Sequence, residues 1–192
     1  MKLKLTLLMV AFTVTTSFSQ VKDTNNTWAA KEFSKDIALY NSKNFLFKNV
    51  LGVSPEVVQF EIIPLAAASS GELTTLLYKC ESKQKEGLIL GFYGMKWNDA
   101  GVVYQGYSFR NLDKNQAIEF LNKIQEAIAN NTKFIADEPD NNNIYFRYDD
   151  IDVLIWGRFQ TFTIRLFWNG FDSTWEQTAY DRSKRRFEKK IK

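Results

Sequence analysis

Alternation of apolar and polar residues between positions 143 and 168 is the feature that most constrains the fold of this chain. In three consecutive segments every second residue is apolar, and turn-forming residues separate the segments. Turns at Asp149-Asp150 and around Arg158-Phe159 align these apolar positions in rows. The rows are Tyr148–Ile151–Leu166, Phe146–Val153–Ile164 and Ile144–Ile155–Phe162. Because a one-residue slip would move a strand's apolar set to the other face, the pattern predicts a three-strand antiparallel meander in this register.

The same register predicts which side chains share the opposite face of the meander. The rows there are Arg147–Asp152–Arg165, Tyr145–Leu154–Thr163 and Asn143–Trp156–Thr161. Two guanidinium groups would share one carboxylate and keep an excess positive charge, which suits a carboxylate, sulfate or phosphate, while an aromatic ring could stack on a sugar. The candidate ligand-binding residues are therefore Arg147, Asp152, Arg165, Tyr145 and Trp156. The alternative interpretation is a set of solvent-facing ion pairs that contribute little to stability.

Two further regions show clear secondary-structure signals. Residues 57–110 are typical of a four-strand meander, with turns near residues 69–71, 83–87 and 98–101. A helix is predicted from Lys114 to Asn130, with Asp113 and Gln116 at the spacing of a capping box. Its apolar stripe consists of Ala117, Phe120, Leu121, Ile124 and Ile128.

Helices are also predicted near both ends of the chain. Thr27 can cap a helix whose Phe33, Ile37 and Tyr40 share one face. Near the other end, Ser173 and Glu176 have capping-box spacing before a C-terminal helix. That helix would carry Trp175, Ala179 and Phe187.

Together these elements predict an α+β fold. We expect a mainly antiparallel sheet built from a four-strand meander and a three-strand meander, with the N-terminal, central and C-terminal helices packed on one face. No proline-rich linker or low-complexity block interrupts residues 20–192, so these residues are predicted to form one domain.

The first 19 residues have the pattern of a secretory signal peptide. Lys2 and Lys4 precede an apolar stretch from Leu5 to Val14, and Ser17 and Ser19 supply the small residues before Gln20. The apolar stretch is shorter than the roughly 20 residues of a transmembrane helix. We therefore expect export to the periplasm or the medium, in a Gram-negative bacterium, with no membrane span left after cleavage.

Positive charge is concentrated at the C-terminal end of the chain. Loss of the two signal-peptide lysines leaves 23 basic against 22 acidic residues, a net charge of +1. Residues 181–192 alone carry +5, so the rest of the mature chain is at −4 and a nucleic-acid-binding surface is not expected. The predicted basic interaction patch contains Arg182, Lys184, Arg185, Arg186, Lys189 and Lys190. It could bind anionic lipid, lipopolysaccharide or an acidic partner. The alternative is a solvated helix end.

Two residue counts exclude whole classes of chemistry. The chain has no histidine, which rules out Ser-His-Asp and Cys-His catalysis and histidine metal sites. Its one cysteine, Cys80, rules out internal disulfides and thiolate zinc clusters, and we expect it to be a small buried residue. No cofactor and no metal are predicted.

Carboxylates are the remaining candidates for catalysis. Asp149, Asp150 and Asp152 form one group, and Asp137, Glu138 and Asp140 form another in a loop that lacks the spacing of a calcium loop. Both groups fall where turns favour aspartate. That position favours a structural role in turns. A glycan hydrolase, which needs two carboxylates across a cleft, is kept as the second hypothesis.

Four aromatic residues crowd the sequence before the C-terminal helix: Phe167, Trp168, Phe171 and Trp175. Such a cluster forms a core contact, or lines a pocket in a carrier of apolar ligands. The leading hypothesis remains an exported, non-enzymatic binding or interaction domain whose ligand is an acidic small molecule, a glycan or a partner protein.

Overall fold

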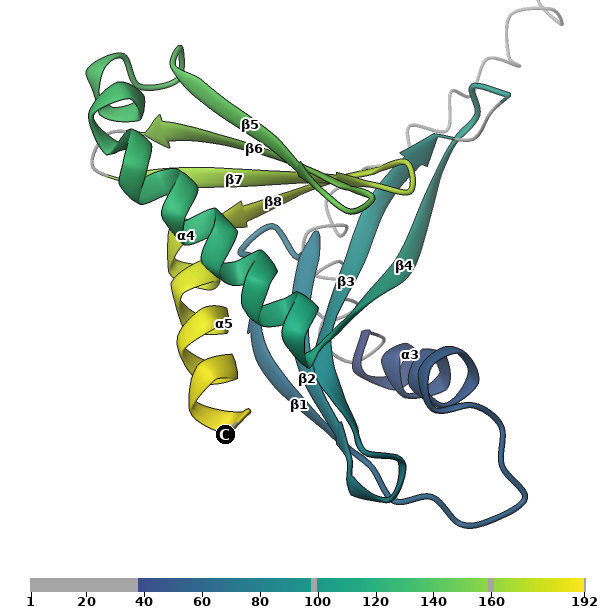
Figure 1. The fold of residues 1–192 in the computed structure, drawn as a ribbon. Coiled ribbons are helices and arrows are strands. Elements are labelled where there is room, and N and C mark those ends of the chain that lie inside the picture. Colours follow the sequence, from purple (N-terminus) through teal and green to yellow (C-terminus); the bar gives the residue numbers. More distant parts are fainter. Residues whose placement is uncertain (1–37, 98–99, 159–160, 192) are drawn as a thin grey trace, which may run out of the picture.

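The computed structural model describes residues 38–97, 100–158 and 161–191 (Figure 1). Its helices are α3 (Ala38–Phe45), which continues into a π-helical stretch (Leu46–Leu51), α4 (Lys114–Asp137) and α5 (Gln177–Lys190). Its strands are β1 (Glu61–Ala67), β2 (Leu73–Cys80), β3 (Lys85–Trp97), β4 (Val103–Asp113), β5 (Asn143–Tyr148), β6 (Ile151–Arg158), β7 (Thr161–Trp168) and β8 (Phe171–Glu176). None of the described helices is long and apolar enough to span a membrane.

The strands form two antiparallel sheets, with orders β1-β2-β3-β4 and β5-β6-β7-β8. Each sheet is a meander followed by one helix, so the order of elements in the first half recurs in the second. The predicted α+β fold with antiparallel pairing is confirmed. The second meander has four strands rather than the three that were predicted.

The additional strand, β8, occupies the place of the predicted second capping box. Ser173 lies within β8, and Glu176 precedes α5 without capping it through its side chain. Asn169 and Gly170 join β7 to β8 with positive φ angles of 49° and 76°. Two consecutive residues in this conformation make the hairpin turn whose backbone twist matches that of the flanking strands, and Asn-Gly is its strongest signal.

One hydrophobic core lies between the two sheets and helices α4 and α5. It includes Leu77 and Leu88 of the first sheet, Val153 and Ile164 of the second, and Phe120 of α4. Figure 1 shows both helices on the same side of the second sheet. The predicted stripe of α4 faces this core, and the Asp113–Gln116 capping box is present. However, α4 continues past Asn130 to Asp137, which brings Ile135 into the core region as a buried residue.

Helix α3 lies on the other face of the first sheet, contrary to the prediction that all helices share one face. Leu46 and Leu51, which follow it, pack with Leu76, Tyr78 and Ile89, while alternate residues of the same strands face α4 and α5. Both faces of β2 and β3 are therefore buried, which accounts for their continuous apolar sequences. The same cluster contains Cys80, a buried free thiol, as expected of a structural cysteine.

Two N-terminal predictions lie wholly or partly outside the described residues: the signal peptide over residues 1–19, and the part of the helix capped by Thr27 that precedes residue 38. Tyr40, assigned to the apolar face of that helix, belongs to α3 and is 73% exposed.

The first hairpin of the second sheet has the predicted register, and the second hairpin does not. Tyr148 pairs with Ile151, and Phe146 with Val153, as predicted. Across the next turn Ile155 pairs with Ile164 instead of Phe162, which is a shift of two residues. A two-residue shift keeps every side chain on its own face, so the buried set is unchanged. The rows on the outer face do change.

Candidate functional site

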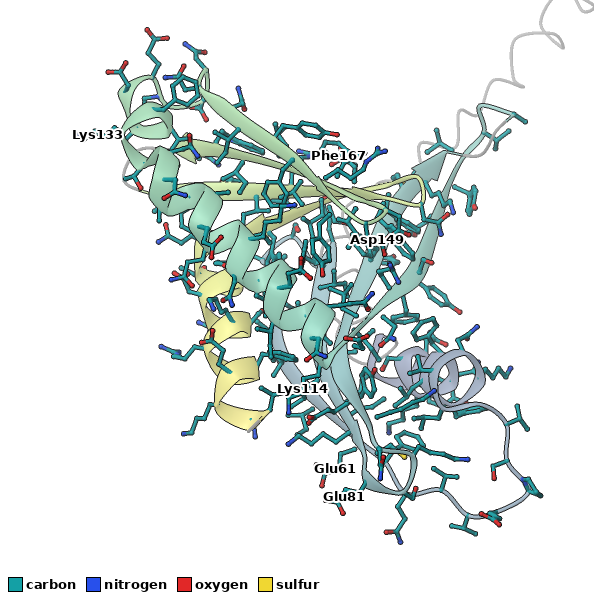
Figure 2. All side chains as sticks on the ribbon, in the orientation of Figure 1. Glu61, Glu81, Lys114, Lys133, Asp149 and Phe167 are labelled. Carbon is teal, nitrogen blue, oxygen red and sulfur yellow. The ribbon has the colours of Figure 1, made fainter. Side chains whose placement is uncertain are left out.

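The candidate site is the outer face of β5–β8, the side of the second sheet that is turned away from α4 and α5. Its strands alternate, with one set of side chains in the core and the other directed outward. Phe167 lies on this outer side in Figure 2. The observed rows are Arg147–Asp152–Phe167–Asp172, Tyr145–Leu154–Arg165–Thr174 and Asn143–Trp156–Thr163–Glu176.

Arg147, Asp152 and Tyr145 form a closed hydrogen-bonded group on this face. Arg147 donates from Nε to Asp152 Oδ1 at 2.6 Å and from Nη2 to Asp152 Oδ2 at 2.7 Å. The Tyr145 hydroxyl donates to the same Oδ1 at 2.8 Å. These bonds from Arg147 and Tyr145 lower the pKa of Asp152 to about 2, and the bond to Asp152 raises the pKa of Tyr145. Asp152 therefore stays ionised and fixes the orientation of its two neighbours.

Arg165 does not share Asp152, which corrects the row predicted from the sequence. It lies beside Leu154 and Thr174, and its Nε and Nη2 donate to the two carboxylate oxygens of Asp172, the second at 2.6 Å. The bond to Asp172 raises the pKa of Arg165. The physical reason is the two-residue register shift together with strand β8, which supplies a second carboxylate. Each guanidinium group thus has its own carboxylate, and the face carries no excess positive charge from this pair.

Apolar side chains stand between and beside the two ion pairs. Tyr145 is 63% exposed and Phe167 is 36% exposed, while Leu154 and Trp156 are half-buried. Isolated exposed aromatics are common on protein surfaces, but here they gather on one sheet face with two arginines.

Two residues of this site, Phe167 and Asp172, were missed from the sequence. Phe167 was assigned to the aromatic cluster, and Asp172 was placed before a helix rather than on a strand. The Asn169-Gly170 dipeptide was the available signal, because a hairpin closed by it pairs Trp168 with Phe171 and Phe167 with Asp172.

Asp149 and Asp150, which the sequence grouped with Asp152, join the two sheets. Arg110 of β4 donates to Asp149 and, at 2.8 Å, to Asp150 Oδ1, and Trp168 donates to Asp150 Oδ2 at 2.8 Å. Burial opposes ionisation of Asp150, but the bonds from Trp168 and Arg110 outweigh it and lower its pKa. Figure 2 shows Asp149 at the tip of the β5–β6 hairpin, beside β4.

The predicted aromatic cluster belongs mainly to the core. Phe171 and Trp175 are buried, and Trp168 packs on Phe92 with ring centroids 5.1 Å apart. Only Phe167 faces outward. Among the described residues, no group of three or more Cys, Asp or Glu side chains could hold a metal ion. That statement covers Asp137, Glu138 and Asp140.

The predicted basic patch of α5 divides into two parts. Lys184 is directed toward α4, where its Nζ donates to Asn122 Oδ1 at 2.8 Å. It also donates to Glu188 of its own helix. The other members are exposed: Arg182, Arg185, Arg186, Lys189 and Lys190. The apolar side of α5 is in the core, with Ala179, Tyr180 and Phe187 buried, so it is not available to insert into a bilayer.

Comparison with known proteins found no matching family model, no matching curated protein and no matching solved structure.

Proposed function

We propose that this protein is a non-enzymatic binding domain that recognises a partner protein through the outer face of β5–β8, after export from the cytoplasm. The observation that carries the proposal is the gathering of Tyr145, Trp156, Phe167 and two arginines on a sheet face that α4 and α5 leave uncovered. Tyrosine, tryptophan and arginine are the residues enriched at the energetic centres of protein interfaces.

Preorganisation supports this proposal. Asp152 holds Arg147 and Tyr145, and Asp172 holds Arg165, so these long side chains lose little rotamer freedom when a partner binds. Strands about 4.8 Å apart with about 3.3 Å per residue give the face an area of roughly 400 Å². That is about half of the ~800 Å² per partner of a standard stable complex, so we expect a transient, micromolar interaction.

Charge argues against the acidic small molecule suggested by the sequence. Both guanidinium groups are already paired with carboxylates, and an incoming anion would have to compete with Asp152 or Asp172. A partner with a neutral surface fits the face better.

Catalysis and apolar-ligand transport have less support than binding. A glycosidase general acid needs a raised pKa, whereas the pKa values of Asp150 and Asp152 are lowered. The side chains of Phe171 and Trp175, which a carrier would need around a cavity, are part of the packed core.

Site-specific photocross-linking in the native host tests the proposal. A photoreactive amino acid at Phe167 should give a discrete protein adduct. The same amino acid at Phe134, which is 50% exposed on α4, should not. Tyr145→Ala should reduce the Phe167 adduct at least about tenfold, since truncating a hot-spot residue costs about 2 kcal/mol or more and about 1.4 kcal/mol is already tenfold.

Three results would contradict the proposal: equal adducts at both positions, no adduct at Phe167, or an adduct that is insensitive to Tyr145→Ala. Circular dichroism of Tyr145→Ala should show an unchanged fold, because the side chain is mostly exposed.

A further inference from the structure

The solvent-facing side of α5 carries a compact group of basic residues that form no ion pair with a described carboxylate. Arg182, Arg185, Arg186 and Lys189, here called the basic ridge, follow one another at helical positions i, i+3, i+4 and i+7. This spacing places all four side chains on one side of the helix. Each of them is exposed, and the opposite side of α5 is buried in the core. The ridge is about 10 Å long, at about 1.5 Å of rise per residue.

Three of the four described arginines outside the ridge have a counter-charge, and the members of the ridge have none. Arg110, Arg147 and Arg165 each form an ion pair with aspartate. No carboxylate among the described residues forms an ion pair with a member of the ridge. Arg186 donates to the carbonyl oxygen of Leu65, which leaves its charge uncompensated.

Helix stability does not explain the ridge. Positive charge is favourable in the last turn of a helix, where it interacts with the macrodipole. Arg182 and Arg185, however, lie in the middle of α5, which spans Gln177–Lys190. Like charges three and four residues apart repel one another. The position of the charges therefore points to an external anion.

We propose that the basic ridge docks the protein on an anionic lipid bilayer by peripheral, electrostatic contact. A protein interface needs an apolar centre, and none of the exposed large apolar residues described in the structure lies on α5. A bilayer presents an array of phosphates that needs no such centre. The charge outside residues 181–192 is −4 in the mature chain, so the field of an anionic bilayer would also orient the molecule with α5 toward it.

Vesicle sedimentation tests this inference, with the protein purified from its native host. Binding should occur on vesicles of phosphatidylcholine mixed with phosphatidylglycerol and be absent on phosphatidylcholine alone. It should weaken steeply between about 0.01 M and 0.15 M salt, as the Debye length falls from about 30 to about 8 Å. Inorganic phosphate at the same ionic strength should compete no better than chloride, which separates a bilayer from a free phosphate site.

Two matched quadruple variants separate the ridge from net charge. Changing Arg182, Arg185, Arg186 and Lys189 to Gln should weaken vesicle binding by about two to three orders of magnitude, at about fivefold per basic residue. The control changes four exposed lysines on other elements to Gln: Lys43, Lys48, Lys83 and Lys133. It removes the same charge, and the partition constant should fall less than about tenfold.

A charge-conserving variant keeps the inference falsifiable if the Gln variant unfolds. Replacing the three arginines of the ridge by lysine should retain vesicle binding. Equal loss in both Gln variants, loss in the lysine variant, or binding of acidic polypeptide without binding of anionic vesicles would overturn the inference. Tyr145→Ala should leave vesicle binding unchanged, so this result is independent of the proposed partner site.

Discussion

Gly157 provides the sharpest test of how the second sheet is positioned. A Cβ atom at this position would lie 2.0 Å from the carbonyl oxygen of Ile135 and 3.0 Å from its carbonyl carbon. Both atoms belong to the backbone of α4, so a rotamer change cannot relieve the clash. An ordinary contact of about 3.4 Å requires α4 and β6 to separate by about 1.4 Å. That movement would also strain the hydrogen bond from the Asp140 amide to the Gly157 carbonyl, now 3.0 Å.

We expect Gly157→Ala to lower the free energy of unfolding by about 3 kcal/mol. Overpacking a well-packed site costs about 1–3 kcal/mol, and partial unpacking of the buried Ile135 adds to it. Urea denaturation followed by circular dichroism measures the change, provided that the m-value is constant. Gly106→Ala is the matched control, because its Cβ would lie 3.4 Å from the Tyr104 ring, an ordinary contact. A Gly157→Ala protein within about 0.5 kcal/mol of wild type would refute the packing described for α4 and β6.

Three further outcomes are expected. Burial raises the pKa of Tyr78 to about 12, so the folded protein retains a proton that the unfolded chain loses near pH 10. Stability should therefore fall as pH rises from about 10 to about 12. Tyr78→Phe should make that fall less steep in urea titrations, and Tyr148 and Tyr180, whose pKa values burial also raises, account for the part that remains. The bonds from Arg147 and Tyr145 lower the pKa of Asp152 to about 2, so the contribution of Asp152 to the free energy of unfolding is present above about pH 4 and is lost as pH falls toward 2. An NMR titration of the Asp152 carboxyl group with a midpoint near pH 4 would contradict this. We expect export with cleavage after Ser19, so mass spectrometry of the protein from the periplasm or medium should find Gln20 at its N-terminus; a protein retaining Met1 would contradict this.

The sequence determined which face each residue of the second sheet occupies more securely than it determined the strand pairing. Alternation has a period of two, so a pattern excludes a one-residue slip but not a two-residue slip. The hairpin at Asp149-Asp150 was placed correctly, since the two residues of its turn are recognisable. The next hairpin has no such marker, and the prediction put Ile155 opposite Phe162 instead of Ile164. The candidate site inherited this error, since Arg165 was assigned to Asp152.

Long-range packing accounts for the other differences. The exit predicted for α4 at Asn130 depended on local propensity, but Ile135 gains a buried site only because the second sheet is nearby. The side of the first sheet on which α3 lies depends on the chain path between Leu51 and Glu61, which no periodicity specifies. In contrast, the Asp113–Gln116 capping box is a local signal and was predicted correctly.

The two proposed surfaces can be occupied at the same time because the second sheet separates them. Helix α5 packs on the inner face of β7 and β8 through Trp175 and Tyr180, whose rings lie 5.2 Å apart. The basic ridge is on the far side of α5 from that contact, and Tyr145 and Phe167 are on the far side of the sheet. A bilayer bound at the ridge would therefore leave the outer face of β5–β8 directed away from the lipid. Adducts at Phe167 should consequently form equally well with and without anionic vesicles, and loss of the adduct on vesicles would show that the two surfaces compete.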